Sequence, residues 1–152
     1  RNKKVRTMST RENIASNLVT VIGNISSPNV KKVTRQPFEL DELSQAQYPA
    51  VLIQTIEETK EDQELGSGAK TRLCTLEFGI TGFIKGSESN IDTARNNLAS
   101  AIESALETDI TRDNNALDTE VISIETDAGS LFPYGAVLIT VRVLYEHQAA
   151  TP

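Results

Sequence analysis

The chain has 152 residues, a length typical of a single domain. Its longest unbroken apolar runs span only a few residues, far fewer than the roughly 18 that a membrane-spanning helix requires, so no contact with a membrane is expected. The single cysteine and the single histidine exclude an internal disulfide framework, a multi-cysteine zinc site and an imidazole-rich metal centre. We therefore expect neither a metal ion nor another cofactor.

Charge divides the chain into a basic start and an acidic remainder. The formal net charge is −6, but residues 1–9 hold four basic side chains, so the remainder carries −10. An acidic body repels a phosphate backbone, which argues against specific binding of nucleic acid by the folded part. We predict a basic N-terminal arm over residues 1–9, one domain over residues 10–147 and a C-terminal tail over residues 148–152.

The first elements predicted along the chain are a helix and a short strand. Over residues 10–25 apolar side chains recur with helical spacing, and Ser9 with Glu12 has the S-x-x-E spacing of a capping box. Residues 30–35 are typical of a strand at the border of a sheet, because their basic side chains discourage unwanted pairing. Residues 36–48 are polar and irregular.

Two further strands with a loop between them are predicted in the middle of the chain. Residues 50–57 form the first of these strands, and the simple alternation of side chains places Glu58 on the face of Leu52. Residues 58–70 combine charged side chains with glycines, a composition that predicts a long mobile hairpin loop. Residues 72–85 alternate apolar and polar side chains, as a half-buried antiparallel strand does.

The second half is predicted to contain one helix and two strands. The helix starts near Ser89, and its apolar stripe continues to Leu106. The strands cover residues 120–126 and 136–147. At about 3.3 Å per residue the last strand reaches roughly 40 Å, about twice a common strand length. We expect that a small sheet cannot pair it along its whole length, so that one end projects or pairs with another chain.

The predicted order is one helix, three strands, a second helix and two strands. Two amphipathic helices and about five strands indicate an α+β fold. We expect a two-layer sandwich in which both helices cover one face of a mostly antiparallel or mixed sheet.

The residue types that catalysis uses are not arranged for it. His147, the only imidazole, stands at the end of the last strand, and no serine lies in a G-x-S-x-G elbow. Cys74 falls on the apolar side of its strand, where a thiol usually packs as a small hydrophobe. The acidic pairs within residues 57–62 lack a metal-binding spacing, so we expect solvated carboxylates there. We do not expect an enzyme.

Six segments, taken in order, resemble the tail-terminator, or tail-completion, proteins of long-tailed bacteriophages. The likeness covers residues 11–147 and depends on the order and spacing of the segments, none of which is a catalytic motif. The segments are RENIASNLVTVIGNI, VKKVTRQPFEL, YPAVLIQTIEE, LCTLEFGITGFIKG, NIDTARNNLASAIESALETD and VISIETDAGSLFPYGAVLITVRVLYEH.

The resemblance implies a structural protein of the virion tail or neck, assembled in the host cytoplasm. It implies a homohexameric ring that caps the tail tube, stops its polymerisation and offers a surface for joining head to tail. The expected partners are other copies of the chain, the tail tube protein and the connector or neck proteins. Genomic DNA would pass the lumen without specific binding.

We expect the contact residues to lie at the ends of the sheet. They are Arg35, Glu57, Glu58, Glu61, Asp62, Glu64, Lys70, Phe132 and Tyr134. We also expect the carboxylates of Glu61, Asp62 and Glu64 to face the lumen. Two alternatives stay open. One is another phage neck or tail-completion protein of the same fold, and the other is a small cytosolic dimer that binds a ligand or regulates.

Overall fold

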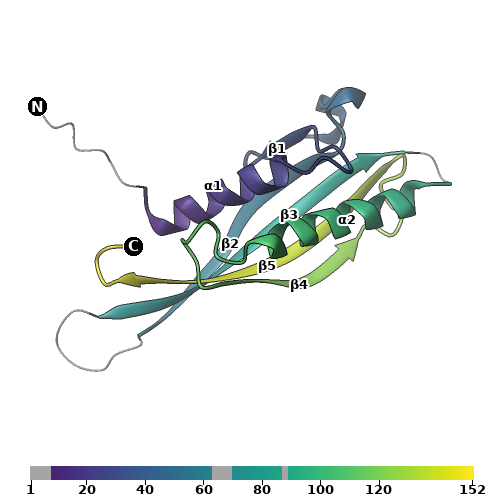
Figure 1. Cartoon of the computed structure of the whole chain (residues 1–152). Helices are drawn as coiled ribbons and strands as arrows, with labels where there is room; N and C mark the ends of the chain where they lie inside the picture. The colour runs from purple at the N-terminus through teal and green to yellow at the C-terminus, as the bar shows by residue number, and fades with distance from the viewer. Residues whose placement is uncertain (1–7, 63–69, 87–88) are drawn as a thin grey trace, which may run out of the picture.

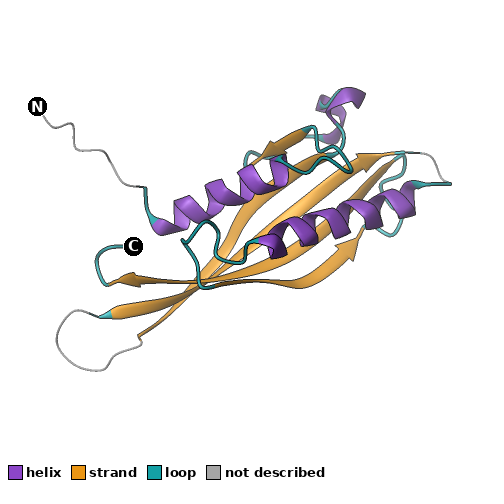
Figure 2. Cartoon of the chain, viewed as in Figure 1, coloured by secondary structure: helices purple, strands orange, loops and turns teal. Residues whose placement is uncertain are grey.

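A five-stranded mixed sheet carries two helices on one of its faces (Figures 1 and 2). The computed structural model describes residues 8–62, 70–86 and 89–152. The strands lie in the spatial order β1-β2-β3-β5-β4, with β1 parallel to β2 and each other neighbouring pair antiparallel. The predicted α+β class is confirmed. In chain order the elements are α1 (Thr10–Gly23), β1 (Lys32–Thr34), β2 (Ala50–Asp62), β3 (Thr71–Lys85), α2 (Ile91–Thr108), β4 (Asp118–Thr126) and β5 (Tyr134–Gln148).

The first helix begins where its capping residue predicts. The Ser9 hydroxyl accepts a hydrogen bond from the Glu12 N–H at 3.3 Å. The Glu12 carboxylate accepts hydrogen bonds from Arg35 instead of completing the predicted capping box, so that box is half formed. Neither α1 nor α2, the helices of the part that the structure describes, is both long and apolar enough to cross a bilayer.

The main core lies between the two helices and the face of the sheet that they cover. The alternation predicted for the strands is confirmed there, and Cys74 belongs to this core as expected. Each large apolar side chain that leaves water here contributes about 1.5–3 kcal/mol, which holds both helices on the sheet. The fully buried side chains of the two central strands are Cys74, Leu76, Phe78, Ile80, Val137, Ile139, Val141, Val143 and Tyr145.

Two predictions about strand length are wrong. β2 extends to Asp62, so residues 58–62 belong to a strand and not to the predicted mobile loop; residues 63–69 lie outside the described part. Pairing with β3, as far as Asp62 opposite Arg72, supports this extension. β5 pairs with β3 along its whole length, against our expectation, because β3 is itself 15 residues long.

A second, smaller apolar cluster lies on the other face of the sheet, at the end where β2 starts. Segment 36–49, with the 3-10 turns η1 (Leu40–Glu42) and η2 (Gln45–Gln47), covers this end, which we call the wide end. The Tyr48 hydroxyl donates to the Leu40 carbonyl at 2.5 Å and holds the segment closed. The cluster consists of Phe38, Leu43, Tyr48, Ala50, Phe83 and Tyr134. Beyond it, the side chains of this face are exposed or half-buried, and we call it the open face.

Candidate interaction surfaces

The sheet continues past the helices as a three-stranded arm, opposite the wide end (Figure 1). The arm consists of residues 60–62 of β2, 71–74 of β3 and 145–148 of β5, the rows in which β5 has no β4 partner. At its base the β2 register shifts between Thr55 and Glu57, which marks a β-bulge. The extra residue inverts the faces beyond it, so Glu58 lies on the helix side and our prediction for its face is wrong.

Glu58 is the centre of a polar cluster at the base of the arm. Its carboxylate accepts hydrogen bonds from Arg11 Nε at 3.1 Å, Arg11 Nη2 at 2.6 Å and the Tyr145 hydroxyl, and Lys60 Nζ lies 3.2 Å away. Burial raises the pKa of Glu58, but the hydrogen bonds from Arg11, Tyr145 and Lys60 outweigh it and lower the pKa to about 2. The prediction that the carboxylates of this segment are solvated is wrong for Glu58, whose side chain is only 12% exposed.

Lys60 extends this cluster across the arm. Its Nζ lies 3.4 Å from Cys74 Sγ and 2.7 Å from His147 Nε2. The cluster therefore ties α1 to β2, β3 and β5, while the Cys74 thiol itself is fully buried. In the part of the chain that the structure describes, no three His, Cys, Asp or Glu side chains are placed to hold a metal ion together.

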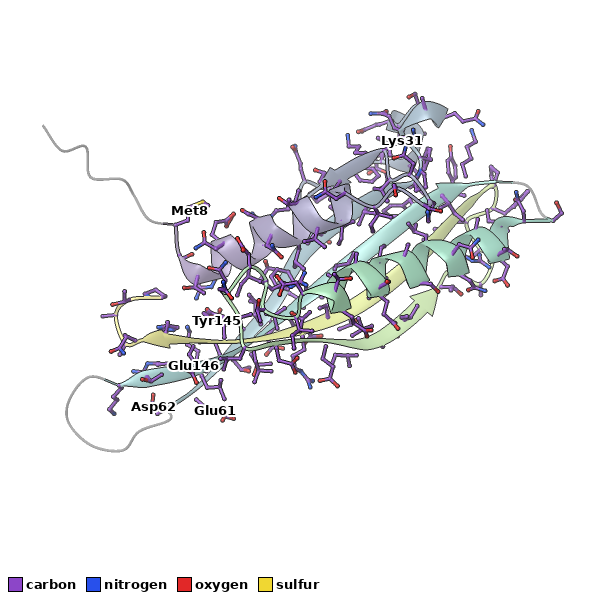
Figure 3. The ribbon with its side chains drawn as sticks, viewed as in Figure 1. Met8, Lys31, Glu61, Asp62, Tyr145 and Glu146 are labelled. Atoms are coloured by element: carbon purple, nitrogen blue, oxygen red, sulfur yellow. The ribbon has the colours of Figure 1, made fainter. Side chains whose placement is uncertain are left out.

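The predicted contact residues near the tip of the arm divide between its two faces. Asp62 lies on the helix side, where it accepts from Arg72 and lies 3.8 Å from Lys70 Nζ. Glu61 is exposed on the opposite face (Figure 3). Because they alternate along β2, the two carboxylates do not share a face. Glu64, the third side chain expected beside them, lies outside the described residues.

The open face of the sheet is strongly acidic. The register of the four long strands places seven carboxylates on it against two basic groups, Arg142 and Lys85. Arg142 lies in one row between Glu77 and Glu120. An apolar island interrupts the charge where Ile56, 57% exposed, lies over the backbone of β3. The seven acidic residues are Glu57, Glu61, Glu77, Asp118, Glu120, Glu125 and Glu146.

The loop between β4 and β5, at the wide end, carries the predicted contact residue Phe132 and is held by a network of hydrogen bonds. Asp127, just after β4, accepts from Ala136 N at 3.0 Å, Leu131 N at 3.1 Å and Arg95 Nη1 at 2.8 Å. The two charged side chains are almost fully buried, with 4% and 7% exposed. This network holds the loop between β4 and β5 against α2, with Phe132 45% exposed at its surface.

Of the two remaining contact predictions, Tyr134 falls at the wide end and Arg35 lies between the two ends of the sheet. Tyr134 is half-buried against Tyr48, with ring centroids 5.7 Å apart, and Lys85 lies over its ring. Arg35 follows β1 and is exposed, paired with Glu12 of α1. The structure thus separates most of the predicted residues into two groups, one at each end of the sheet, with Arg35 between them.

Sequence reasoning missed the residues that organise both groups. Arg11 contacts Glu58 across 47 positions, and Arg95 contacts Asp127 across 32. No sequence motif links the residues of either pair, because each contact depends on the position at which a helix packs on the sheet. The only signal in the sequence was a charged residue on the apolar stripe of a helix, as Arg95 is.

The sequence matches no known protein-family profile and none of the curated proteins with which it was compared. Among solved structures, one similar chain belongs to a particle described as the virion of a native gene transfer agent. The two chains are 9% identical, the match covers 91% of this chain and 92% of that chain, and the TM-score is 0.39. A likeness at this level carries no inference about function.

Proposed function

We propose that the chain is a structural protein of a phage-like virion, a tail terminator that forms a ring on the last layer of the tail tube. In this role it ends tube growth by covering the exposed edges of the tube and offers a different surface to the connector. The proposed action is steric, without catalysis and without a cofactor.

The observation that supports this proposal best is the acidic open face. The four long strands carry seven carboxylates and two basic groups on this face, and Lys32 of β1 adds a third basic group. The excess of carboxylates repels phosphates, so the face suits the wall of a channel through which DNA passes without sticking. The sequence resemblance over residues 11–147 supports the same role independently. In this arrangement Glu61 faces the channel, whereas Asp62 stays bound to Arg72 on the other face.

A gene deletion tests the role directly. Particles from a phage that lacks this gene should carry over-long tubes that are not joined to heads, as seen by electron microscopy. Tubes of normal length that are detached from heads would favour the alternative of a neck or head–tail connector protein. Normal particles would overturn both proposals.

The mass of the purified chain tests the ring. A ring of six gives six times the 16.6 kDa of one chain. A stable dimer at all concentrations would favour the alternative of a small ligand-binding or regulatory protein, because a two-fold contact between two copies closes on itself.

A further inference from the structure

Two strands of the sheet have a strand neighbour on one side only. β4 is one border and pairs with β5 alone; β1 is the other and pairs with β2 alone. Along β4, nine residues leave one row of backbone hydrogen-bonding groups without a strand partner among the described residues. Open borders of this kind readily recruit a strand from another chain.

The directions of the two border strands favour a head-to-tail contact. β2, β3, β5 and β4 alternate in direction, and β1 runs parallel to β2, so β1 and β4 run in opposite directions. When a second copy is placed beside the first to continue the sheet, its β1 meets β4 as an antiparallel neighbour. Antiparallel pairing is the slightly more stable ladder.

The charges of the two borders are complementary. β4 carries Asp118, Glu120 and Glu125 and no basic residue. Residues 31–35, the β1 border, carry Lys31, Lys32 and Arg35 and no acidic residue (Lys31 is labelled in Figure 3). Among the described residues neither Lys31 nor Lys32 has an acidic partner within ion-pair distance, and Lys32 Nζ lies over the Phe38 ring, 5.7 Å from its centroid.

The register brings particular charges together. Thr34 and Glu125 lie in one row across the sheet, through Leu52, Thr81 and Leu138. If the sheet continued into a second copy in this row, Glu125 would lie opposite Thr34 and diagonal to the copy's Lys32. Pairs at this diagonal spacing are within reach of long side chains.

Exposed apolar side chains along β4 also favour a contact that would bury this border strand against another chain. Leu117, Ile122 and Ile124 are 52%, 42% and 44% exposed at or beside this border. We propose that the β4 border of one copy binds the β1 border of the next, head to tail around the ring. This inference rests on the ring advanced as the proposed function.

The same charges disfavour the competing two-fold contact. Pairing of β4 with β4 of a second copy would bring six carboxylates together with no basic residue on either strand. Only the head-to-tail contact uses both borders of every copy, and a heterologous contact of that kind forms a ring when its rotation closes.

Charge reversal at each border of the full chain tests the proposal. We expect two double variants to be single chains in native mass spectrometry, whereas the wild type forms a ring. One is Glu120→Lys with Glu125→Lys, and the other is Lys31→Glu with Lys32→Glu. Both reversals in one chain should restore the ring. An equimolar mixture of the two single-border variants should also restore it, since every contact in an alternating ring is then complementary.

A matched control separates the border from overall charge. Glu103→Lys with Glu107→Lys changes the charge equally on α2, outside both border strands, and should leave the ring mass unchanged. Far-UV circular dichroism and the midpoint of thermal unfolding show whether each variant is folded.

The outcomes distinguish this inference from the proposed function. Wild-type rings whose mass survives both border reversals would overturn the inference and leave the ring intact as a proposal. A mixture that recovers only a dimer would assign the contact to the two-fold arrangement and overturn it too. Wild-type chains that stay monomeric at every concentration would overturn both.

Discussion

Arg11 of α1 and Glu58 of β2 form a bidentate pair, with Nε to Oε1 at 3.1 Å and Nη2 to Oε2 at 2.6 Å. Such paired hydrogen bonds between a guanidinium and a carboxylate are among the stronger polar contacts in proteins. This pair fastens the first helix to the arm where the strands leave the helical layer. The stability of that junction should therefore depend on the charge of Glu58.

Replacing Glu58 by Gln should lower the free energy of unfolding by about 2 kcal/mol at pH 7. Because hydrogen bonds lower the folded pKa of Glu58 to about 2 from its ordinary value of 4.5, its contribution is fully present above pH 4.5. It is lost as the pH falls from 4.5 towards 2. Urea unfolding of both proteins at pH 7, 5, 4 and 3 should show the difference shrinking below pH 4.5.

Glu57→Gln is the control for this prediction, because Glu57 is exposed on the other face of the same strand. Its effect should stay within about 0.5 kcal/mol at each pH. A Glu58→Gln difference that stays constant from pH 7 to pH 3 would contradict the assigned cause.

Two glycine-to-alanine substitutions should have opposite effects. A Cβ at Gly82 would lie 2.6 Å from Leu98 Cδ2 and 3.3 Å from Val137 Cγ1, both on fully or nearly fully buried side chains. Gly82→Ala should push α2 from the sheet and cost about 2 kcal/mol. Gly23→Ala meets only Val33 Cγ2, at 3.9 Å, and should raise stability by about 0.5 kcal/mol through helix propensity. Thermal unfolding of both variants decides the signs.

Arg112 should be a structural arginine. Its side chain is fully buried, and Nη2 donates to the Leu106 carbonyl at 2.6 Å and to the Asp109 carbonyl, which satisfies the C-terminal end of α2. Arg112→Ala should lower the free energy of unfolding by about 3 kcal/mol, because it removes these bonds and leaves a cavity. Both effects are measured by urea unfolding. Arg142→Ala, at an exposed arginine, should change the free energy of unfolding by less than about 0.5 kcal/mol. Equal effects would be inconsistent with this role.

The two acidic partners of Arg95 should differ sharply in their effects. Asp127→Ala leaves a buried guanidinium without its buried partner and should cost about 3 kcal/mol. Asp92, whose side chain is 75% exposed, should cost less than about 1 kcal/mol when replaced by Ala. Limited proteolysis should also cut the 128–133 loop faster in Asp127→Ala, and an unchanged cleavage rate would show that Asp127 does not hold the loop.

Periodicity predicted the elements because burial of one face dominates their energetics. The helical stripe around Leu18 and the alternation through Leu76 and Phe78 each need only local spacing, and all three side chains are fully buried as expected. The class and the order of elements follow from these patterns. Strand ends did not follow, because they depend on the length of the partner strand.

The face of Glu58 could not be predicted because one bulged residue reverses everything beyond it. No turn residue or glycine marks Ile56 as the extra residue. The bulge also places Glu58 against Arg11 and Tyr145. Without the bulge, the polar cluster of the arm could therefore not be predicted. The hydrogen bonds of Asp127 at the wide end could not be predicted for a different reason. In the sequence Asp127 is an ordinary loop residue, and only the packing of α2 on the sheet places Arg95 beside it.

The unbroken pairing of β3 with β5 has a mechanical consequence. From Thr71 to Lys85 every residue of β3 has a β5 partner without a register shift, over roughly 50 Å at 3.3 Å per residue. The two strands therefore form one uninterrupted hydrogen-bonded ladder, which links the tip of the arm to the loops beside α2 without a break where a hinge could form.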